Sequence, residues 1–148
     1  MSNRYQLVQT VSRLELKDRL DPKVGAVYVD FVEGKARHRL LFGGGKGQDI
    51  AKAVGLNKHK DLHIVDATAG LGREAFVLAS LGCQVTLLER SPMMHALLAD
   101  GLQRAANSND SQLHAIISRM HLVHTDARSW LETTEHQADV VYLDPMFP

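Results

Sequence analysis

Residues 144–148, Asp-Pro-Met-Phe-Pro, follow directly behind an apolar run at 140–143. The Asp144 side chain and the Pro145 carbonyl are two acceptors that can bind both hydrogens of an exocyclic amine on a base. Such a pair would aim the amine's lone pair at a methyl sulfonium, while Phe147 stacks on a base that has left its helix. Placement and desolvation would then supply the rate. These residue types predict a catalytic site for methyl transfer; a turn built on Asp-Pro is the alternative.

A second group of candidate residues is the loop that contains Asp66, Gly70 and Gly72. Glycines let a backbone approach a ligand closely, and the helix that follows offers free N–H groups. The glycines also fit the dinucleotide pattern G-x-G-x-x-A, but in that pattern they come directly after the strand, whereas residues 66–69 intervene here. The longer loop suits S-adenosyl-L-methionine, whose ammonium Asp66 can balance. A plain strand-to-helix turn is the alternative.

Two further acids follow apolar runs. Glu89 ends the run at 84–88, where a carboxylate can accept both hydroxyls of a ribose, whether in NAD or in S-adenosylmethionine. A surface glutamate is the alternative. Asp126 comes after the run at 122–124 and could hydrogen-bond an adenine amine, with the N–H of Ala127 facing the ring. Asp126 could equally be the N-cap of the next helix, and the two roles are compatible.

The elements that must position these residues alternate along the chain from residue 61 on. This alternation of strands and helices predicts βαβ units and a parallel sheet. Ser91 is expected to cap one helix at its start, and Gly82 to close another in the left-handed conformation. Strands are expected at residues 63–65, 84–88, 122–124 and 139–143, and helices at 73–81, from 92 and around 113–120.

The first part of the chain has a different pattern, which predicts a β-rich extension over residues 1–60 ahead of a Rossmann-like domain over 61–148. We expect two strands of a hairpin at residues 26–31 and 38–42, and a candidate for a further strand at residues 5–16. A short helix is expected at residues 49–54, closed by Gly55.

Charge divides along the same boundary. Residues 1–60 hold 12 Lys and Arg against 6 Asp and Glu, which gives +6, and residues 61–148 hold 5 against 11, which gives −6. This asymmetry favours a basic face that contacts RNA phosphates, with ordinary solvated surface as the alternative.

Several classes of function have little support. No apolar run approaches the length of a membrane span. The single cysteine, Cys83, cannot form an internal disulfide, which fits a reducing cytoplasm, and we interpret it as a packing residue. No metal site is expected, because the histidines have no cysteine partner at a typical spacing. Residues 43–47 resemble a phosphate loop, but no Ser or Thr follows the lysine. Residues 43–47 could be a loop beside the active site or a structural turn, and both interpretations stay open.

Taken together, the motifs resemble the RsmJ (YhiQ) family of bacterial 16S rRNA guanine-N2 methyltransferases. The resemblance is carried by residues 66–79, 88–90 and 141–148, with 29–32 and 42–47 upstream. It implies a class I Rossmann-like methyltransferase sheet and methyl transfer to a guanine N2 in 16S rRNA of the small ribosomal subunit. The cofactor contacts that it implies lie at Arg73, Glu74, Glu89, Arg90, Asp126, Ala127 and Asp144.

Two consequences follow from the resemblance. The family's chains continue past residue 148, so we expect four parallel strands here, with the C-terminal part of the sheet missing, and we do not expect the fragment to act alone. Two other functions stay open beside methyl transfer. One is a NAD-dependent oxidoreductase, which the long loop at 66–72 disfavours; the other is a non-catalytic module that binds RNA or the ribosome.

Overall fold

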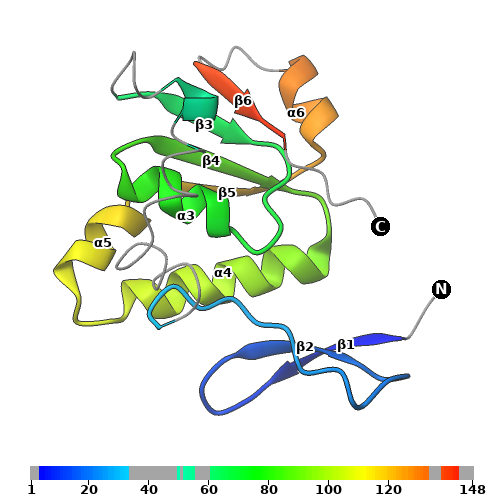
Figure 1. Ribbon diagram of the computed structural model, residues 1–148. Coiled ribbons are helices and arrows are strands. Elements are labelled where there is room, and N and C mark those ends of the chain that lie inside the picture. Colours follow the sequence, from blue (N-terminus) through cyan, green and yellow to red (C-terminus); the bar gives the residue numbers. More distant parts are fainter. Residues whose placement is uncertain (1–3, 34–49, 51, 56–60, 134–137, 144–148) are drawn as a thin grey trace.

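The computed structural model describes residues 4–33, 50, 52–55, 61–133 and 138–143, and Figure 1 shows the course of the chain. The described elements form one parallel sheet with its helices and one antiparallel hairpin. In chain order they are β1 (Tyr5–Gln9), β2 (Leu14–Asp18), β3 (His63–Asp66), α3 (Arg73–Ser80), β4 (Gln84–Glu89), α4 (Pro92–Ala106), α5 (Ser111–Ile117), β5 (Met120–His124), α6 (Ala127–Thr133) and β6 (Val140–Tyr142).

The main sheet has the strand order β5-β4-β3-β6, and every pair in it is parallel. The α/β class and the four parallel strands are therefore confirmed. Successive strands extend from β3 through β4 to β5, whereas β6 pairs with the opposite side of β3. The direction of winding thus reverses between β3 and β6, and open α/β sheets bind their ligands at such a switch point.

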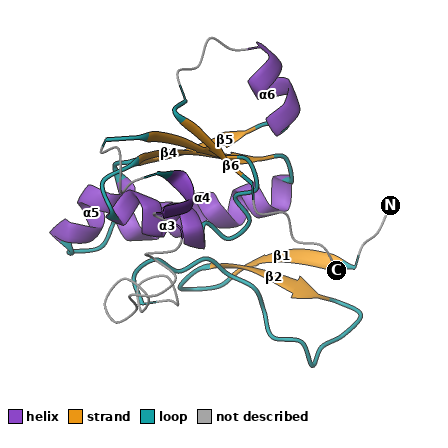
Figure 2. Cartoon of the chain, turned by 45° about the horizontal axis from the view of Figure 1, so that its top comes forward, coloured by secondary structure: helices purple, strands orange, loops and turns teal. Residues whose placement is uncertain are grey.

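The core lies where the sheet meets its helices. Figure 2 shows α3, α4 and α5 on one side of the sheet and α6 on the other. The two central strands are apolar on both faces, as strands of parallel sheets usually are, and Ile64, Val65, Val85 and Leu87 are fully buried. Apolar burial of this kind is the main favourable term in folding.

The helix ends follow the expected chemistry. The Ser91 hydroxyl accepts a hydrogen bond from the N–H of Met94 at 3.3 Å, which caps α4. Gly82 takes a φ of 102° after α3, as a left-handed cap requires. Helix α5 begins earlier than predicted, at Ser111, because the Asp110 carboxylate accepts from two N–H groups of its first turn.

The predicted hairpin at 26–31 and 38–42 is wrong in its described half. Residues 26–31 form no strand; Val27 makes only an isolated bridge to Leu16. The alternation that suggested a strand reflects burial instead, because Val29 and Phe31 insert between helices with 2% and 1% of their surface exposed. Residues 38–42 lie outside the described part.

The observed hairpin lies earlier in the chain. The predicted strand at 5–16 is in fact two strands, since β1 and β2 pair antiparallel with Leu7 opposite Leu16. The short predicted helix is confirmed where it is described, at Ile50 and residues 52–54, and Gly55 follows with a φ of 87°. The division of the chain into two domains stays a prediction.

Contacts distant in sequence attach the N-terminal segment to α4. The Asp100 carboxylate accepts from the backbone N–H of Leu14 at 3.0 Å and from Arg104 Nε at 2.9 Å. Arg104 also donates to the carbonyl of Val29. Phe31 stacks on Phe76 of α3 with 5.1 Å between ring centroids. The segment around residues 29–31 is thereby part of the same core as the sheet.

Replacing Gly101 with alanine should destabilise the full-length protein by roughly 1–3 kcal/mol, the usual cost of overpacking. A Cβ added there would lie 2.8 Å from Val29 Cβ and 3.2 Å from the Val29 carbonyl oxygen, so α4 and the N-terminal segment must separate. Urea unfolding measures the loss. Gly25→Ala is the control, because nothing lies within 4 Å of its added Cβ. Equal stability of the two variants would contradict this packing.

Candidate active site

The candidate site lies at the edge where the carboxyl ends of the four parallel strands meet. Asp66 pairs with Tyr142 in the register of β3 and β6, and Glu89 pairs with His124 in that of β4 and β5. The loops that leave these strands are joined by hydrogen bonds. The N–H of Ala67 donates to the Tyr142 carbonyl at 3.0 Å, and the N–H of Thr125 donates to the Glu89 carbonyl at 3.0 Å. The edge is therefore a connected set of strand ends, as the sequence indicated.

The loop after β3 is folded tightly around its acid. Asp66 is 1% exposed, and its Oδ1 accepts from the N–H of Thr68 at 3.0 Å. Gly70 and Gly72 both have positive φ values, 55° and 76°, which side chains other than glycine rarely adopt. A hydrogen bond of 2.8 Å from the N–H of Gly72 to the carbonyl of Ala69 closes the turn. The carboxylate thus shapes the loop, and its contact with a cofactor ammonium stays a prediction.

The first turn of α3 carries Arg73 and Glu74, both partly buried. Gly72 occupies the N-cap position, and no side chain caps the helix there. The leading N–H groups of a helix have no partners within the helix, so they can receive a ligand that approaches the loop. The cofactor contacts of Arg73 and Glu74 that the family resemblance implies stay a prediction.

Glu89 ends β4 with its side chain partly buried. Its Oε2 accepts from the N–H of Ser91 at 2.9 Å, and this bond fixes the direction of the carboxylate. Among the described residues, Oε1 takes part in no recorded hydrogen bond, so the group retains an acceptor for a ligand. The geometry suits a ribose hydroxyl, which would donate to it.

Two histidines at this edge were missed by the sequence reasoning. His124 ends β5, and its Nε2 donates to the carbonyl of Arg90 at 3.2 Å. Its ring stacks on that of His95 in the first turn of α4, with 4.8 Å between centroids. The hydrogen bond to Arg90 and the stacking on His95 hold His124 against the loop that follows Glu89. The position of His124 at the end of an apolar run was the available signal, but its partner is set by tertiary structure.

Asp126 is exposed and acts as the cap of α6. Its Oδ1 accepts from the N–H of Arg128 at 3.0 Å, and its carbonyl accepts from the N–H of Trp130 at 3.0 Å. The capping alternative is therefore confirmed. A carboxylate oxygen can accept more than one hydrogen bond, so the predicted contact of Asp126 and Ala127 with adenine stays compatible with the cap.

The catalytic candidates Asp144, Pro145 and Phe147 lie outside the described residues. The strand that leads to them is described: Tyr142 lies opposite Asp66 in β6, beside the switch point. The phosphate-loop-like segment at 43–47 also lies outside the described part.

Cys83 is fully buried, and burial raises the pKa of its thiol above the ordinary value. A neutral thiol in apolar surroundings is a packing group and a poor nucleophile, which agrees with the sequence interpretation. Within the described ranges, no group of three or more His, Cys, Asp or Glu side chains could hold a metal ion. No described helix is long and apolar enough to cross a membrane.

The parallel sheet, its reversal of winding and the helices on its two faces (Figure 2) define a Rossmann-like α/β fold. The chain belongs to the family of putative SAM-dependent methyltransferases, whose family model matches residues 1–148. Its structural similarity to the SAM-dependent methyltransferase from Neisseria gonorrhoeae has a TM-score of 0.77 at 38% identity, over 95% of this chain and 56% of that one.

Named relatives are similar in sequence over nearly the whole of this chain. The chain is 58% identical over 145 residues to ribosomal RNA small subunit methyltransferase J of Aeromonas salmonicida, covering 97% of this chain and 57% of the relative. It is 59% identical over 147 residues to the protein of the same name from Chromobacterium violaceum, covering 97% and 55%. The chain therefore spans little more than half the length of these relatives.

Proposed function

We propose that the full-length protein transfers a methyl group from S-adenosylmethionine to the exocyclic N2 of a guanine in 16S rRNA of the small ribosomal subunit, in the cytoplasm. The observation that carries the proposal is the convergence of the Asp66 loop, Glu89 and the end of β6 on one edge at the switch point. Relatives named as small-subunit rRNA methyltransferases support the substrate class.

In this proposal the donor half of the site is formed by the loops after β3, β4 and β5. The Asp66 loop would receive the amino-acid end of the cofactor, with Arg73 and Glu74 beside it. The Glu89 carboxylate would accept from the ribose, and Asp126 would contact the adenine. The described residues fit such a ligand, because Glu89 Oε1 faces no recorded hydrogen-bond partner among them while Oε2 is fixed.

The acceptor half would follow β6. Asp144 and the Pro145 carbonyl would bind the two hydrogens of the guanine amine, and Phe147 would stack on the base. S-adenosylmethionine supplies the electrophilic methyl group when it is bound. The amine nitrogen would form the new bond to carbon, the carbon–sulfur bond would break with its electrons passing to sulfur, and Asp144 would accept the departing proton.

The rival functions differ in cofactor and in product. A NAD-dependent oxidoreductase would also use an acid such as Glu89, but its glycines would follow β3 directly. Here residues 67–69 lie between the end of β3 and Gly70, and the family membership favours S-adenosylmethionine. A module that only binds RNA would need none of the donor half, so cofactor binding separates this case.

Replacing Glu89 with alanine should weaken S-adenosylmethionine binding roughly 10- to 100-fold, because a hydrogen bond to a charged group contributes about 1.5–3 kcal/mol. Calorimetric titration of the full-length protein measures the effect. Glu132→Ala on α6 is the control, since Glu132 is exposed and pairs only with Arg128 among the contacts recorded for it. If Glu89→Ala bound S-adenosylmethionine with unchanged affinity, Glu89 would not be a cofactor-binding residue.

The proposed function is tested by incubating the full-length protein with methyl-labelled S-adenosylmethionine and either unmodified 16S rRNA or assembled small subunits. Label should enter the RNA of one or both substrates, and NAD should show no binding in a parallel titration. Absence of label from both RNAs would contradict the proposal, and NAD binding would favour the oxidoreductase.

A further inference from the structure

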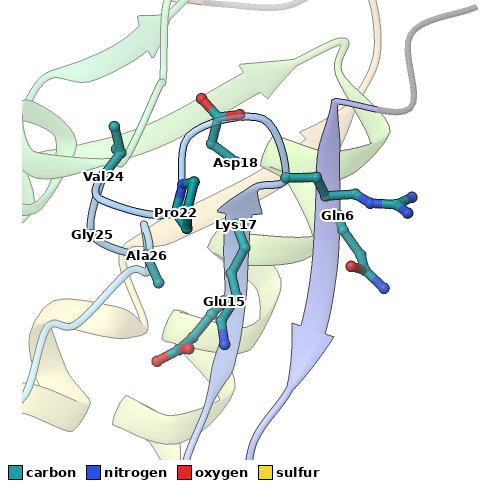
Figure 3. A pocket seen from close by; sticks show the side chains of 9 residues that line it. Gln6, Glu15, Lys17, Asp18, Pro22, Val24, Gly25 and Ala26 are labelled. Atoms are coloured by element: carbon teal, nitrogen blue, oxygen red, sulfur yellow. The ribbon is translucent and has the colours of Figure 1, made fainter.

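A separate pocket lies on the N-terminal hairpin, away from the carboxyl edge of the sheet. It has a volume of about 670 Å³ and is bounded by one face of the β1–β2 hairpin and by the turn that follows β2. Figure 3 shows Lys17 and Glu15 extending from β2 on the same side, with Pro22 and Val24 on the turn. The lining residues are Gln6, Glu15, Lys17, Asp18, Arg19, Pro22, Val24, Gly25 and Ala26.

The two faces of the hairpin have different partners. Leu7, Leu14 and Leu16 share one face and pack against the hydrophobic core. Gln6 and Lys17 are cross-strand partners on the other face, which is the face that borders the pocket. The pocket is therefore a feature of the outer surface, and its polar lining is not needed to attach the hairpin to α4.

Both acids of the pocket already have cationic partners. Glu15 Oε2 accepts from Arg13 Nε at 2.8 Å, and Asp18 Oδ2 accepts from Arg4 at 2.8 Å. The hydrogen bond from Arg4 holds the pKa of Asp18 below its ordinary value, so this carboxylate stays ionised. Within each pair the positive charge of the arginine largely cancels the negative charge of the acid. Neither pair therefore attracts or repels an anion strongly.

Lys17 and Arg19 are left with uncompensated charge. Both side chains are exposed, and no ion pair is recorded for either of them within the described ranges. The pocket therefore presents two positive charges beside neutralised acids. Two such cations around a space that can hold more than a single phosphate suit a phosphodiester with its sugar.

The end of β2, where Asp18 and Arg19 border the pocket, lies on the same side of the molecule as the carboxyl edge of the sheet (Figure 1). In Figure 1 the arrowhead of β2 lies on the same side of the molecule as the arrowheads of β3 and β4 and the start of α4. A ligand strand that enters the catalytic edge on this side would pass the hairpin. Residues 1–33, which include the whole pocket lining, hold five Lys and Arg against five Asp and Glu, so attraction of a polyanion to the pocket depends on Lys17 and Arg19 themselves.

We propose that Lys17 and Arg19 each bind a backbone phosphate of the RNA substrate, at a distance from the guanine that reacts. This inference rests on the proposed function, since it takes RNA as the substrate. The lining offers only Pro22, Val24 and Ala26 as apolar groups and no aromatic pocket, so it lacks the anchor site that a protein partner usually needs. The contact would position the RNA without reading its sequence.

The test compares two double variants of the full-length protein. Lys17→Gln with Arg19→Gln removes the two pocket cations, and Lys23→Gln with Lys52→Gln removes two exposed cations that do not line the pocket. Filter binding to a 16S rRNA fragment is measured across a series of salt concentrations. Circular dichroism and thermal unfolding check that each variant keeps the fold of the parent protein.

The pocket variant should bind RNA about tenfold more weakly at low salt, and the slope of log K against log salt should decrease by about 1.4, the value for two phosphate contacts on a single strand. Its KM for RNA should rise while kcat and the affinity for S-adenosylmethionine stay unchanged. The control variant should remain within about twofold of the parent protein, as dispersed surface charges are screened.

Two outcomes would overturn the inference: unchanged RNA binding and salt slope in the pocket variant, or an equal loss in the control variant. A parent protein that binds no RNA would overturn it as well. Failure of the proposed function has a different signature, because the parent protein would then transfer no methyl group although its RNA binding still responds to Lys17 and Arg19.

Discussion

Replacing Asp144 with alanine in the full-length protein is expected to slow methyl transfer roughly 100- to 1,000-fold, the usual cost of removing one group that contacts the reacting atoms in the transition state. The guanine amine would lose the acceptor that holds one hydrogen and aims the lone pair. Binding of S-adenosylmethionine should decrease much less, because the Asp66 loop and Glu89 supply most of the predicted cofactor contacts. Single-turnover rates and calorimetry separate the two effects.

Asp144→Asn is the matched control for this prediction. The amide keeps an acceptor oxygen of the same size and loses the charge, so its rate should lie between those of the parent protein and the alanine variant. Undiminished methylation by Asp144→Ala would contradict the catalytic role of the residue. If Asp144→Ala lost cofactor affinity and methyl-transfer rate by the same factor, Asp144 would act only in cofactor binding.

Replacing Gly72 with alanine should lower stability by roughly 2–4 kcal/mol and weaken cofactor binding with it. Part of the cost is the left-handed backbone, since φ is 76° at this position. The rest is overlap, because an added Cβ would lie 2.9 Å from Leu98 Cδ2 and 3.2 Å from Phe31 Cζ. The loop and the start of α3 must shift to relieve it. Urea unfolding and calorimetric titration measure the two losses.

Gly70→Ala separates strain from overlap. Its φ is also positive, at 55°, but the nearest atom to an added Cβ is the Thr68 carbonyl oxygen at 3.9 Å. The Gly70 variant should therefore lose only about 1 kcal/mol, the cost of the backbone conformation. Equal losses at the two positions would contradict the close packing of Gly72 against α4 and Phe31.

The parallel sheet could be predicted because its signals are local and repeated. Continuous apolar runs marked β3 and β4, and the ends of their helices carried residues with a specific backbone role, Ser91 as N-cap and Gly82 in the left-handed conformation. The edge that carries Asp66 and Glu89 followed from the sheet, since parallel strands end on the same side. The placement of these two acids at one edge was therefore accessible from the sequence.

The N-terminal segment could not be predicted in the same way. The alternation of Val29 and Phe31 is typical of a strand, but these residues are buried against helices and not paired in a sheet. Their environment depends on Asp100 and Arg104 of α4, which lie far along the chain. Local pattern carries no information on such contacts.

Parts of the site depended on tertiary structure for the same reason. The stacking of His95 on His124 brings together α4 and β5, and neither residue belongs to a recognisable motif. The charge balance of the hairpin pocket was also hidden, because the sequence shows Lys17 and Asp18 as neighbours while the structure pairs Asp18 with Arg4. Net charge along a sequence does not reveal which cations are left without a partner.

The central claim is that the edge formed by β3, β4, β5 and β6 methylates a guanine amine with S-adenosylmethionine as the donor. Its most direct test is nucleoside mass spectrometry of 16S rRNA after reaction with the full-length protein and with Asp144→Ala. The account predicts N2-methylguanosine as the product of the parent protein and almost none from the variant. A methyl group on another atom or base, or equal amounts of N2-methylguanosine from both proteins, would contradict it.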